Sequence, residues 1–283
     1  MIKFIECPRD AMQGIPILIP TEKKIKYIQS LLEVGFDVID FGSFVSSKVI
    51  PQMADTAEVL NGLDLTNTKS KLLAIVANTK GAMEACLHPQ IDFIGYPFSI
   101  SETFQHRNTN SSIGESFERV KEIALLTHES GKELVIYISM GFGNPYGDDF
   151  NVDIIHHWVE KIAGLGVKIF SLSDTIGVAT PELITEVFKG TVGYYNDLEF
   201  GAHLHSAPYN WLPKVKAAYK GGCRRFDVAI GGLGGCPLAK DELVGNLATE
   251  YFVNFFRKQF KPEFDEKAFE RSLRIANEIF HLS

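Results

Sequence analysis

The feature that most constrains this chain of 283 residues is a regular alternation of short apolar runs with amphipathic segments. Eight runs rich in β-branched and aromatic residues are short and mostly continuous in hydrophobicity, as expected for strands buried on both faces. They are Ile2–Glu6, Val38–Phe41, Leu72–Ala77, Phe93–Tyr96, Leu134–Ser139, Lys168–Leu172, Phe200–His203 and Phe226–Ile230. A helical stretch follows each run, so the pattern predicts successive βαβ units with parallel strands.

Several of the helical stretches carry start and stop signals. One opens at Thr21 and stops at Gly35, and others cover Glu115–His128, Val152–Ala163, a segment beginning at Thr180-Pro181, and Asn210–Tyr219. Residues 243–282 are predicted to form two more helices, which Pro262 separates. Eight units favour a closed barrel, and no GxGxxG motif follows the first strand. We expect an α/β fold: a (β/α)8 TIM barrel with extra C-terminal helices, forming one catalytic domain over residues 1–283.

Charge and cysteine content exclude some classes of protein. The formal net charge is −7 and no basic block stands out, which argues against nucleic-acid or membrane-surface partners. None of the four cysteines forms a CxxC pair, so a thiolate zinc site is not expected. The first residues lack the apolar core of a signal peptide, and no apolar run reaches about 18 residues. The sequence therefore predicts a reduced, cytoplasmic protein without a membrane span.

The strongest local signal is the pair His203 and His205. In a barrel of this kind, chemistry lies at the C-terminal ends of the strands, and strand residues two apart point to the same face. Asp10 follows the first strand, which only the eighth strand separates from the seventh. Two histidines and one carboxylate can hold a divalent metal and leave positions open for water and substrate. The alternative is that the two histidines are packed or hydrogen-bonded barrel residues.

Other polar residues support chemistry less strongly. His156 and His157 are neighbours in a helical pattern, where they face different ways, which argues against a joint metal role. Arg9 could stabilise an enolate oxygen, or simply form a salt bridge. Cys236 lies in the glycine-rich run GGLGGCP. Its thiol could carry a proton if the loop closes over a site, although an unreactive cysteine or a backbone phosphate cradle would fit the same residues.

Five motifs in order resemble one known family. They are CPRDAMQ, GSFVSSKVIPQMAD, SLSDTIGVATP, HLH and GGLGGCPLA…GNLATE, between about residues 2 and 255. Together they resemble the 3-hydroxy-3-methylglutaryl-CoA lyase family of the DRE-TIM metallolyase superfamily. Sibling synthases share the barrel, the Arg-Asp pair and the HxH motif. The SFVS…PQMAD stretch and the glycine-rich loop are similar to the lyase branch specifically.

The resemblance implies roles for individual residues. Asp10, His203 and His205 match metal ligands, and Asn246 matches a further ligand or close neighbour. Arg9 matches an arginine that steadies an enolate, and Cys236 matches a cysteine that moves a proton. The polar residues Gln13, Asp174 and Thr175 match pocket-lining positions. The chain departs from the family pattern at Ala11 and Met12, at Asp40, which replaces a glutamate among the catalytic candidates, and at Ser206–Tyr209.

The same resemblance implies a reaction. A site holding Mg²⁺ or Mn²⁺ would cleave 3-hydroxy-3-methylglutaryl-CoA, or a related 3-hydroxyacyl-CoA, to acetyl-CoA and a 3-oxo acid. The partner would be this acyl-CoA substrate, and a homodimer is expected. Three alternatives stay open: a synthase that condenses acetyl-CoA with a 2-oxo acid, an Fe(II) oxygenase, and a non-catalytic barrel that binds an acyl-CoA or a protein partner.

Overall fold

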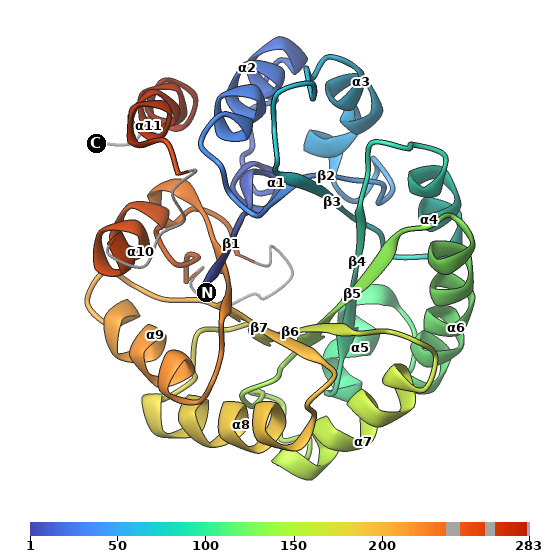
Figure 1. Ribbon diagram of the computed structural model, residues 1–283. Coiled ribbons are helices and arrows are strands. Elements are labelled where there is room, and N and C mark those ends of the chain that lie inside the picture. Colours follow the sequence, from blue (N-terminus) through green and yellow to red (C-terminus); the bar gives the residue numbers. More distant parts are fainter. Residues whose placement is uncertain (236–243, 258–263, 282–283) are drawn as a thin grey trace.

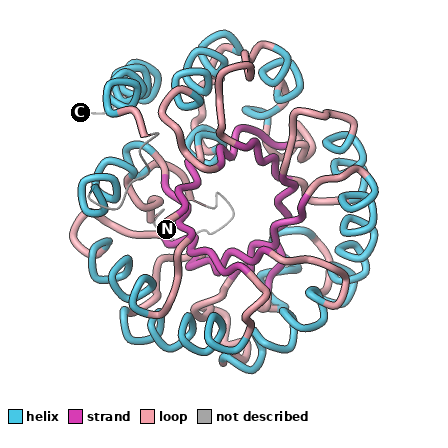
Figure 2. The backbone as a smooth tube through the Cα atoms, viewed as in Figure 1, coloured by secondary structure: helices cyan, strands magenta, loops and turns pink. Residues whose placement is uncertain are grey.

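The computed structural model describes residues 1–235, 244–257 and 264–281. Eight parallel strands form a closed barrel in which each strand pairs with its neighbours in sequence, and β8 pairs with β1. Figure 1 shows the ring of strands with the helices around it, and Figure 2 shows the same two layers by secondary structure. The strands are β1 (Lys3–Glu6), β2 (Val38–Ser43), β3 (Lys71–Ile75), β4 (Phe93–Ser99), β5 (Glu133–Ser139), β6 (Ile169–Asp174), β7 (Glu199–Leu204) and β8 (Arg225–Val228). The predicted (β/α)8 barrel is confirmed.

Helices connect the strands and cover the outside of the barrel. They are α1 (Pro8–Gln13), α2 (Thr21–Leu32), α3 (Thr56–Asn61), α4 (Thr79–Cys86), α5 (Glu102–Thr109), α6 (Ile113–Glu129), α7 (Val152–Ala163), α8 (Pro181–Tyr194), α9 (Trp211–Lys220), α10 (Thr249–Phe256) and α11 (Glu266–Phe280), with two 3₁₀ turns, η1 (Pro51–Met53) and η2 (Ile230–Gly232). Side chains cap several of these helices. Ser112 and Glu115 form a reciprocal capping box at the start of α6, and Thr180 caps α8, where Pro181 occupies the first turn.

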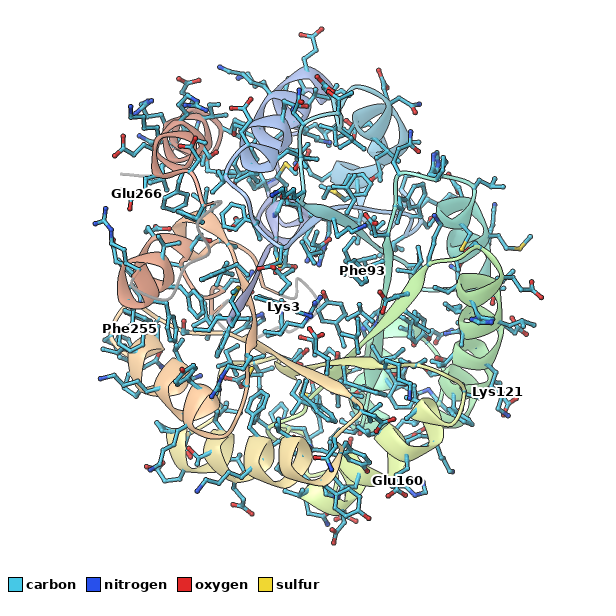
Figure 3. The ribbon with its side chains drawn as sticks, in the orientation of Figure 1. Lys3, Phe93, Lys121, Glu160, Phe255 and Glu266 are labelled. Carbon is cyan, nitrogen blue, oxygen red and sulfur yellow. The ribbon has the colours of Figure 1, made fainter. Side chains whose placement is uncertain are left out.

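Two apolar clusters arise because successive strand residues point to opposite faces. A small cluster lies in the barrel interior and contains Ile5, Val38 and Val135. Phe93 packs against this cluster, and Figure 3 shows it projecting into the ring. A larger cluster, which contains Phe4 and Ile39, lies between the strands and the helices.

The two C-terminal helices have different positions. In α10, the ring of Phe252 lies 5.2 Å from that of Phe4 and 5.0 Å from that of Phe226. This helix therefore takes the place of the eighth barrel helix. The last helix, α11, packs beside α2 outside the ring (Figure 1), with the rings of Tyr27 and Phe280 edge-to-face at 5.4 Å. Both helices predicted for the tail are present, and α11 lies outside the barrel ring.

Helix α1 was not among the predicted elements. The sequence PRDAMQ forms a six-residue helix directly after β1, with Pro8 in its first turn. Because helical residues three and four positions apart lie on one face, α1 brings Arg9, Asp10 and Gln13 together.

Among the described residues, no helix combines the length and the apolar character that crossing a membrane requires.

Candidate metal centre and active site

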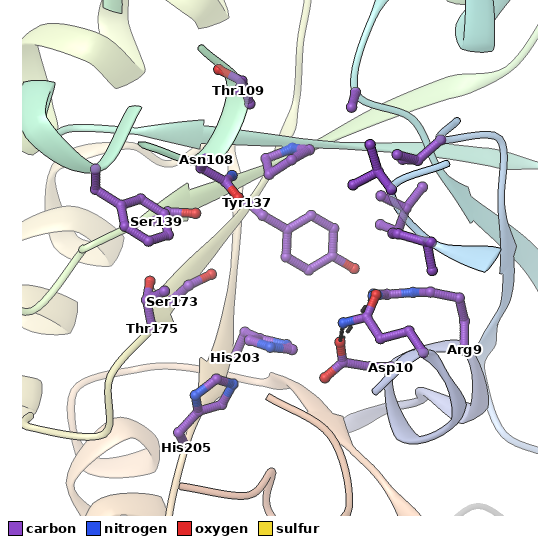
Figure 4. Close-up of a pocket in the computed structure, with 18 residues that line it drawn as sticks. Arg9, Asp10, Asn108, Thr109, Tyr137, Ser139, Ser173, Thr175, His203 and His205 are labelled. Carbon is purple, nitrogen blue, oxygen red and sulfur yellow. Dashed lines mark hydrogen bonds and ion pairs between the residues drawn. The ribbon is translucent and has the colours of Figure 1, made fainter. Parts of the chain in front are cut away.

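Asp10, His203 and His205 converge at the C-terminal mouth of the barrel. Each residue offers one ligand atom, and these three atoms lie within 4.8 Å of one another. Asp10 comes from α1, whereas His203 and His205 come from the end of β7 and the residue just beyond it. Figure 4 shows the three side chains facing one another across one side of the pocket. His203 and His205, two positions apart, therefore point to the same side, as the two-residue period of a strand predicted.

The two histidines each have one ring nitrogen bonded away from the site. Nδ1 of His203 lies 3.1 Å from the carboxylate of Asp227, and His205 hydrogen-bonds the backbone of Thr175. Nε2 of His205 is buried and has no hydrogen-bond partner among the described residues. Burial, together with the nearby charge of His203, lowers the pKa of His205 to about 4. His205 is therefore neutral at pH 7, which is the form of histidine that binds a metal.

The carboxylate of Asp10 is held on both oxygens. Oδ1 accepts hydrogen bonds from Arg9 Nη1 at 2.9 Å and Gln13 Nε2 at 2.5 Å. Oδ2 accepts one from the amide of Asn246 at 2.5 Å. Burial alone would raise the pKa of Asp10, but the charges of Arg9 and then His203, with the Asn246 hydrogen bond, lower it overall. Asp10 is therefore ionised and fixed in place.

Arg9 is locked beside this carboxylate by Asp40. Nε of Arg9 lies 3.0 Å and Nη2 lies 2.5 Å from Oδ2 of Asp40, which is fully buried on β2. Nη1 of Arg9 also donates to Gln13 at 2.9 Å. Burial raises the pKa of Asp40 to about 6, and the charge of Arg9 opposes a larger rise. Asp40 lies behind Arg9 and is not among the pocket-lining residues, which suits an orienting function better than proton transfer.

The segment that carries Asn246 lies against Asp10 and His205, two of the three candidate metal ligands. Asn246 forms an isolated antiparallel bridge with His205, and its amide also donates to the carbonyl of Leu233 at 2.8 Å. Gly234 has a φ of +105° and lies so close that a Cβ there would be 2.4 Å from Asn246 Nδ2 and 2.7 Å from Asp10 Oδ2. Only glycine fits this approach without strain.

A cavity of about 260 Å³ opens beside the three ligand residues. Its lining includes Arg9, Asp10, Gln13, Thr175, His203 and His205, all of which were predicted site residues. Apolar residues also line it: Val45, Val49, Ile50, Ile75, Ala77, Pro97 and Phe104. The cavity therefore offers both charged and apolar contacts to a ligand.

Further polar residues line the cavity that the sequence reasoning missed: Asn108, Thr109, Tyr137, Ser139 and Ser173. Tyr137 and Ser139 are two residues apart at the end of β5, so the alternation rule that identified the histidine pair could have found them. Asn108 and Thr109 lie on α5, a helix that was not predicted. For these two residues the sequence carries no comparable signal.

The predictions for Thr175, Asp174 and Cys236 have three different outcomes. Thr175 lines the cavity, and its hydroxyl accepts a hydrogen bond from the backbone N–H of Met140 at 2.8 Å. The prediction that Asp174 lines the pocket does not match the structure. Asp174 follows the inward Ser173, so its side chain points outward, where it binds Nζ of Lys214 at 2.6 Å. Cys236 lies outside the described residues.

The donor set fits a divalent metal. Two imidazole nitrogens and one carboxylate suit Mn²⁺, Fe²⁺ or Mg²⁺ with open coordination positions. The unpartnered Nε2 of buried His205 is the observation that supports this fit, because a buried polar atom without a partner is costly. Asp10, His203 and His205 would hold the ion. Asn246, which donates a hydrogen bond to Asp10, lies next to the ligand group.

Comparisons with known proteins agree with this geometry. The family model described as HMGL-like matches residues 2–272. The mitochondrial hydroxymethylglutaryl-CoA lyase of Mus musculus is 33% identical over 255 residues, covering 89% of this chain and 77% of that protein. The hydroxymethylglutaryl-CoA lyase YngG of Bacillus subtilis is 32% identical over 246 residues, covering 87% and 81%.

Solved structures show the same similarity. An HMG-CoA lyase from Acinetobacter baumannii, in complex with coenzyme A and 3-methylmalate, superposes with a TM-score of 0.90 at 30% identity, covering 99% of this chain and 92% of that one. The HMG-CoA lyase of Bacillus subtilis gives a TM-score of 0.90 at 30% identity, covering 98% and 93%. With the metal-site geometry and the match over nearly its whole length, this chain belongs to the HMGL-like family.

Proposed function

We propose that this chain is a metal-dependent carbon–carbon lyase whose catalytic domain spans residues 1–283. Its substrate would be hydroxymethylglutaryl-CoA or a closely related 3-hydroxyacyl-CoA thioester, and its products acetyl-CoA and a 3-oxo acid, which is acetoacetate for the parent substrate. The observation that carries this proposal is the convergence of Asp10, His203 and His205 beside a locked Arg9 at one cavity. The relatives named as lyases, one of them bound to coenzyme A, support it.

A divalent ion held by Asp10, His203 and His205 would supply Lewis acidity, which lowers the pKa of the substrate hydroxyl. Asp10 or a neighbouring group is our candidate for the base that takes the hydroxyl proton. The carbon–carbon bond then breaks, so that the oxygen's electrons form the carbonyl of the 3-oxo acid and the electrons of the broken bond form the enolate of the acetyl thioester. The enolate carbon then takes up a proton to give acetyl-CoA. Cys236 is our candidate for the proton donor, on the resemblance of its loop alone.

Arg9 is preorganised for the enolate oxygen. Of its five N–H groups, those on Nε and Nη1 and one on Nη2 bond Asp40, Asp10 and Gln13. One N–H on Nη2 is left over among the described contacts. Since Arg9 lines the cavity, this donor can bind an oxygen on which negative charge develops, without moving during the reaction.

The test is a cleavage assay with Mg²⁺ or Mn²⁺ over a small panel of 3-hydroxyacyl-CoA thioesters. We expect cleavage of at least one thioester, abolished by EDTA and by Asp10→Ala, and strongly reduced by Cys236→Ala. The reverse assay, thiol release from acetyl-CoA with a 2-oxo acid, should be silent. Thiol release there would indicate a synthase, and metal binding without cleavage of any thioester would indicate a binding protein.

We also infer a homodimer in the cytoplasm. The homodimer is based on the family resemblance and on α11, which lies outside the barrel ring. Light scattering coupled to size exclusion would measure the mass, for which a dimer of 31.5 kDa chains is expected. Fractionation of the source cells would test the compartment.

A further inference from the structure

We propose that Asp227 is a positioning residue for the metal site, because its carboxylate fixes the ring tautomer of His203 and leaves Nε2 to bind the ion. The inference rests on the proposed metal site but not on the identity of the substrate. Neither the sequence motifs nor the relatives' names assign a function to Asp227. It lies on β8, beneath the cavity mouth.

The register of the barrel brings the two side chains together. Ala202 of β7 pairs with Phe226 of β8, so the next residue of each strand, His203 and Asp227, points into the barrel at the same level. Nδ1 of His203 lies 3.1 Å from Oδ2 of Asp227. Only 1% of the Asp227 side chain and 13% of the His203 side chain is exposed. The contact is therefore shielded from water and keeps its geometry.

The chemistry of the pair determines which nitrogen carries the proton. An ionised carboxylate can only accept a hydrogen bond, so Nδ1 of His203 must donate. The unprotonated nitrogen of the neutral ring is then Nε2, and its lone pair is free for a metal. If the partner of Nδ1 were a group that can both donate and accept, either nitrogen of the ring could carry the proton.

Two further contacts hold the pair. The hydroxyl of Ser171 on β6 donates to the same Oδ2 of Asp227 at 3.1 Å, which keeps the carboxylate from rotating. The ring of Tyr137 on β5 meets the ring of His203 edge-to-face, with centroids 5.8 Å apart and an angle of 89°. The imidazole is thus held at Nδ1 by a residue of the adjacent strand β8 and packs against a ring from β5 across the barrel interior.

The alternative is that Asp227 only completes the hydrogen bonding of the barrel interior. That function would affect folding stability, but neither the tautomer of His203 nor the metal affinity of the folded protein would depend on it. Oδ1 of Asp227 has no hydrogen-bond partner among the described residues, so the hydrogen bonds that Asp227 does form are concentrated on the oxygen that faces His203. This one-sided bonding favours the positioning function.

The first measurement uses the metal-free protein. Long-range ¹H–¹⁵N correlations report the tautomer of each histidine at a pH where the ring is neutral, and His203→Gln assigns the signal. We expect the Nδ1–H form of His203 in the parent protein. In Asp227→Asn we expect a mixture with the Nε2–H form, because an amide offers both an acceptor and a donor.

The second measurement is the Kd for Mn²⁺ by calorimetry, without substrate. Removal of such a partner weakens metal binding by roughly 10- to 100-fold; we expect this loss for Asp227→Asn and a several-fold loss for Ser171→Ala. The control is Glu6→Gln, which changes a similarly buried carboxyl group on the adjacent β1 that bonds Ile230 N and Thr249 Oγ1 instead of a histidine. Glu6→Gln should leave the Kd unchanged.

An unchanged Kd and tautomer in a folded Asp227→Asn protein would overturn the proposal. If that variant does not fold, Ser171→Ala decides, and an unchanged Kd there would overturn it as well. Both readouts are independent of turnover. A parent protein that binds Mn²⁺ but cleaves no thioester would contradict the proposed function while leaving this inference testable.

Discussion

Gly234 shows how closely one residue of the glycine-rich run approaches the metal site. A Cβ at this position would lie 2.7 Å from Oδ2 of Asp10 and 3.0 Å from its carbonyl oxygen. The backbone φ of +105° is also one that L-residues rarely adopt. Gly234 therefore lets the backbone approach Asp10 and Asn246 closely. From the sequence alone, the glycines of this run could equally have served to let the loop close over a site.

Gly234→Ala should therefore displace Asp10 or Asn246. We expect it to weaken Mn²⁺ binding by roughly tenfold or more, as substitutions of residues that contact metal ligands do. Calorimetric titration measures the Kd. The control is Gly193→Ala in α8, where a Cβ meets no atom within 4 Å and alanine favours the helix. Equal Kd values for Gly234→Ala and the parent protein would show that the backbone adjusts without affecting the site.

We propose both a catalytic and a structural function for Arg9, and a pair of variants separates them. Arg9→Gln should lower kcat by roughly 10²–10³, the usual cost of a lost donor to a developing oxyanion. It should also destabilise the fold by about 3–5 kcal/mol, because Asp40 is left buried without its partner.

Adding Asp40→Asn to Arg9→Gln removes the buried charge. We expect the double variant to regain much of the unfolding free energy in urea titrations but none of the lost activity. Recovery of both would mean that Arg9 acts only as a structural partner of Asp40.

At the scale of elements, β1, η2 and the start of α10 meet around the buried carboxyl group of Glu6. Its oxygens accept hydrogen bonds from Ile230 N at 3.0 Å and Thr249 Oγ1 at 2.6 Å. Burial raises the pKa of Glu6 from 4.5 to about 8, although both hydrogen bonds oppose the rise. The folded protein therefore keeps a proton that the unfolded chain releases over this range.

The sign of the pH effect follows from this difference. Above pH 4.5 the unfolded chain binds fewer protons than the folded protein, so the unfolding free energy contributed by Glu6 falls as pH rises towards 8. The fall is up to about 1.4 kcal/mol per pH unit. Urea unfolding of the parent protein and Glu6→Gln at several pH values should show the variant with the flatter profile; parallel profiles would mean that Glu6 is ionised in the folded state.

Helix α1 is the element that the sequence reasoning lacked and the site most needs. Six residues are too few to show a helical period, and no helix was predicted between the first strand and Thr21. The helix places Gln13 one turn beyond Arg9 and Asp10, so that the three side chains bond one another. The sequence motifs pointed to these three residues, but the hydrogen bonds among their side chains depend on this short helix.

For the whole molecule, metal binding and folding should be linked. The candidate ligand residues come from α1, from β7 and from the residue just beyond β7, so the site exists only in the closed barrel. An ion that binds only the folded state raises the unfolding free energy by about 2.7 kcal/mol at 100 times its Kd.

We expect Mn²⁺ to raise the Tm, EDTA to reverse the rise, and His205→Gln to abolish it in scanning fluorimetry. His157→Gln is the control, since this exposed histidine on α7 lies outside the ligand group. A Tm rise that persists in His205→Gln would place the ion elsewhere.

The sequence alone determined the features that have a local period. Runs of strand and helix length in regular alternation specified the barrel, and the two-residue strand period placed His203 and His205 on one face. The Arg9-Asp10 pair after the first strand, with the family motifs, then pointed to the right end of the barrel.

Tertiary structure decided what depends on residues far apart in the chain. The bond between Asn246 and Asp10 spans 236 positions, and that between Arg9 and Asp40 spans 31. Closure of the ring also decided which alternate face of each strand turns inward, which directs Ser173 to the cavity, Asp174 to Lys214 and Asp227 to His203. No local pattern encodes that choice, because it is fixed only when the first and eighth strands pair.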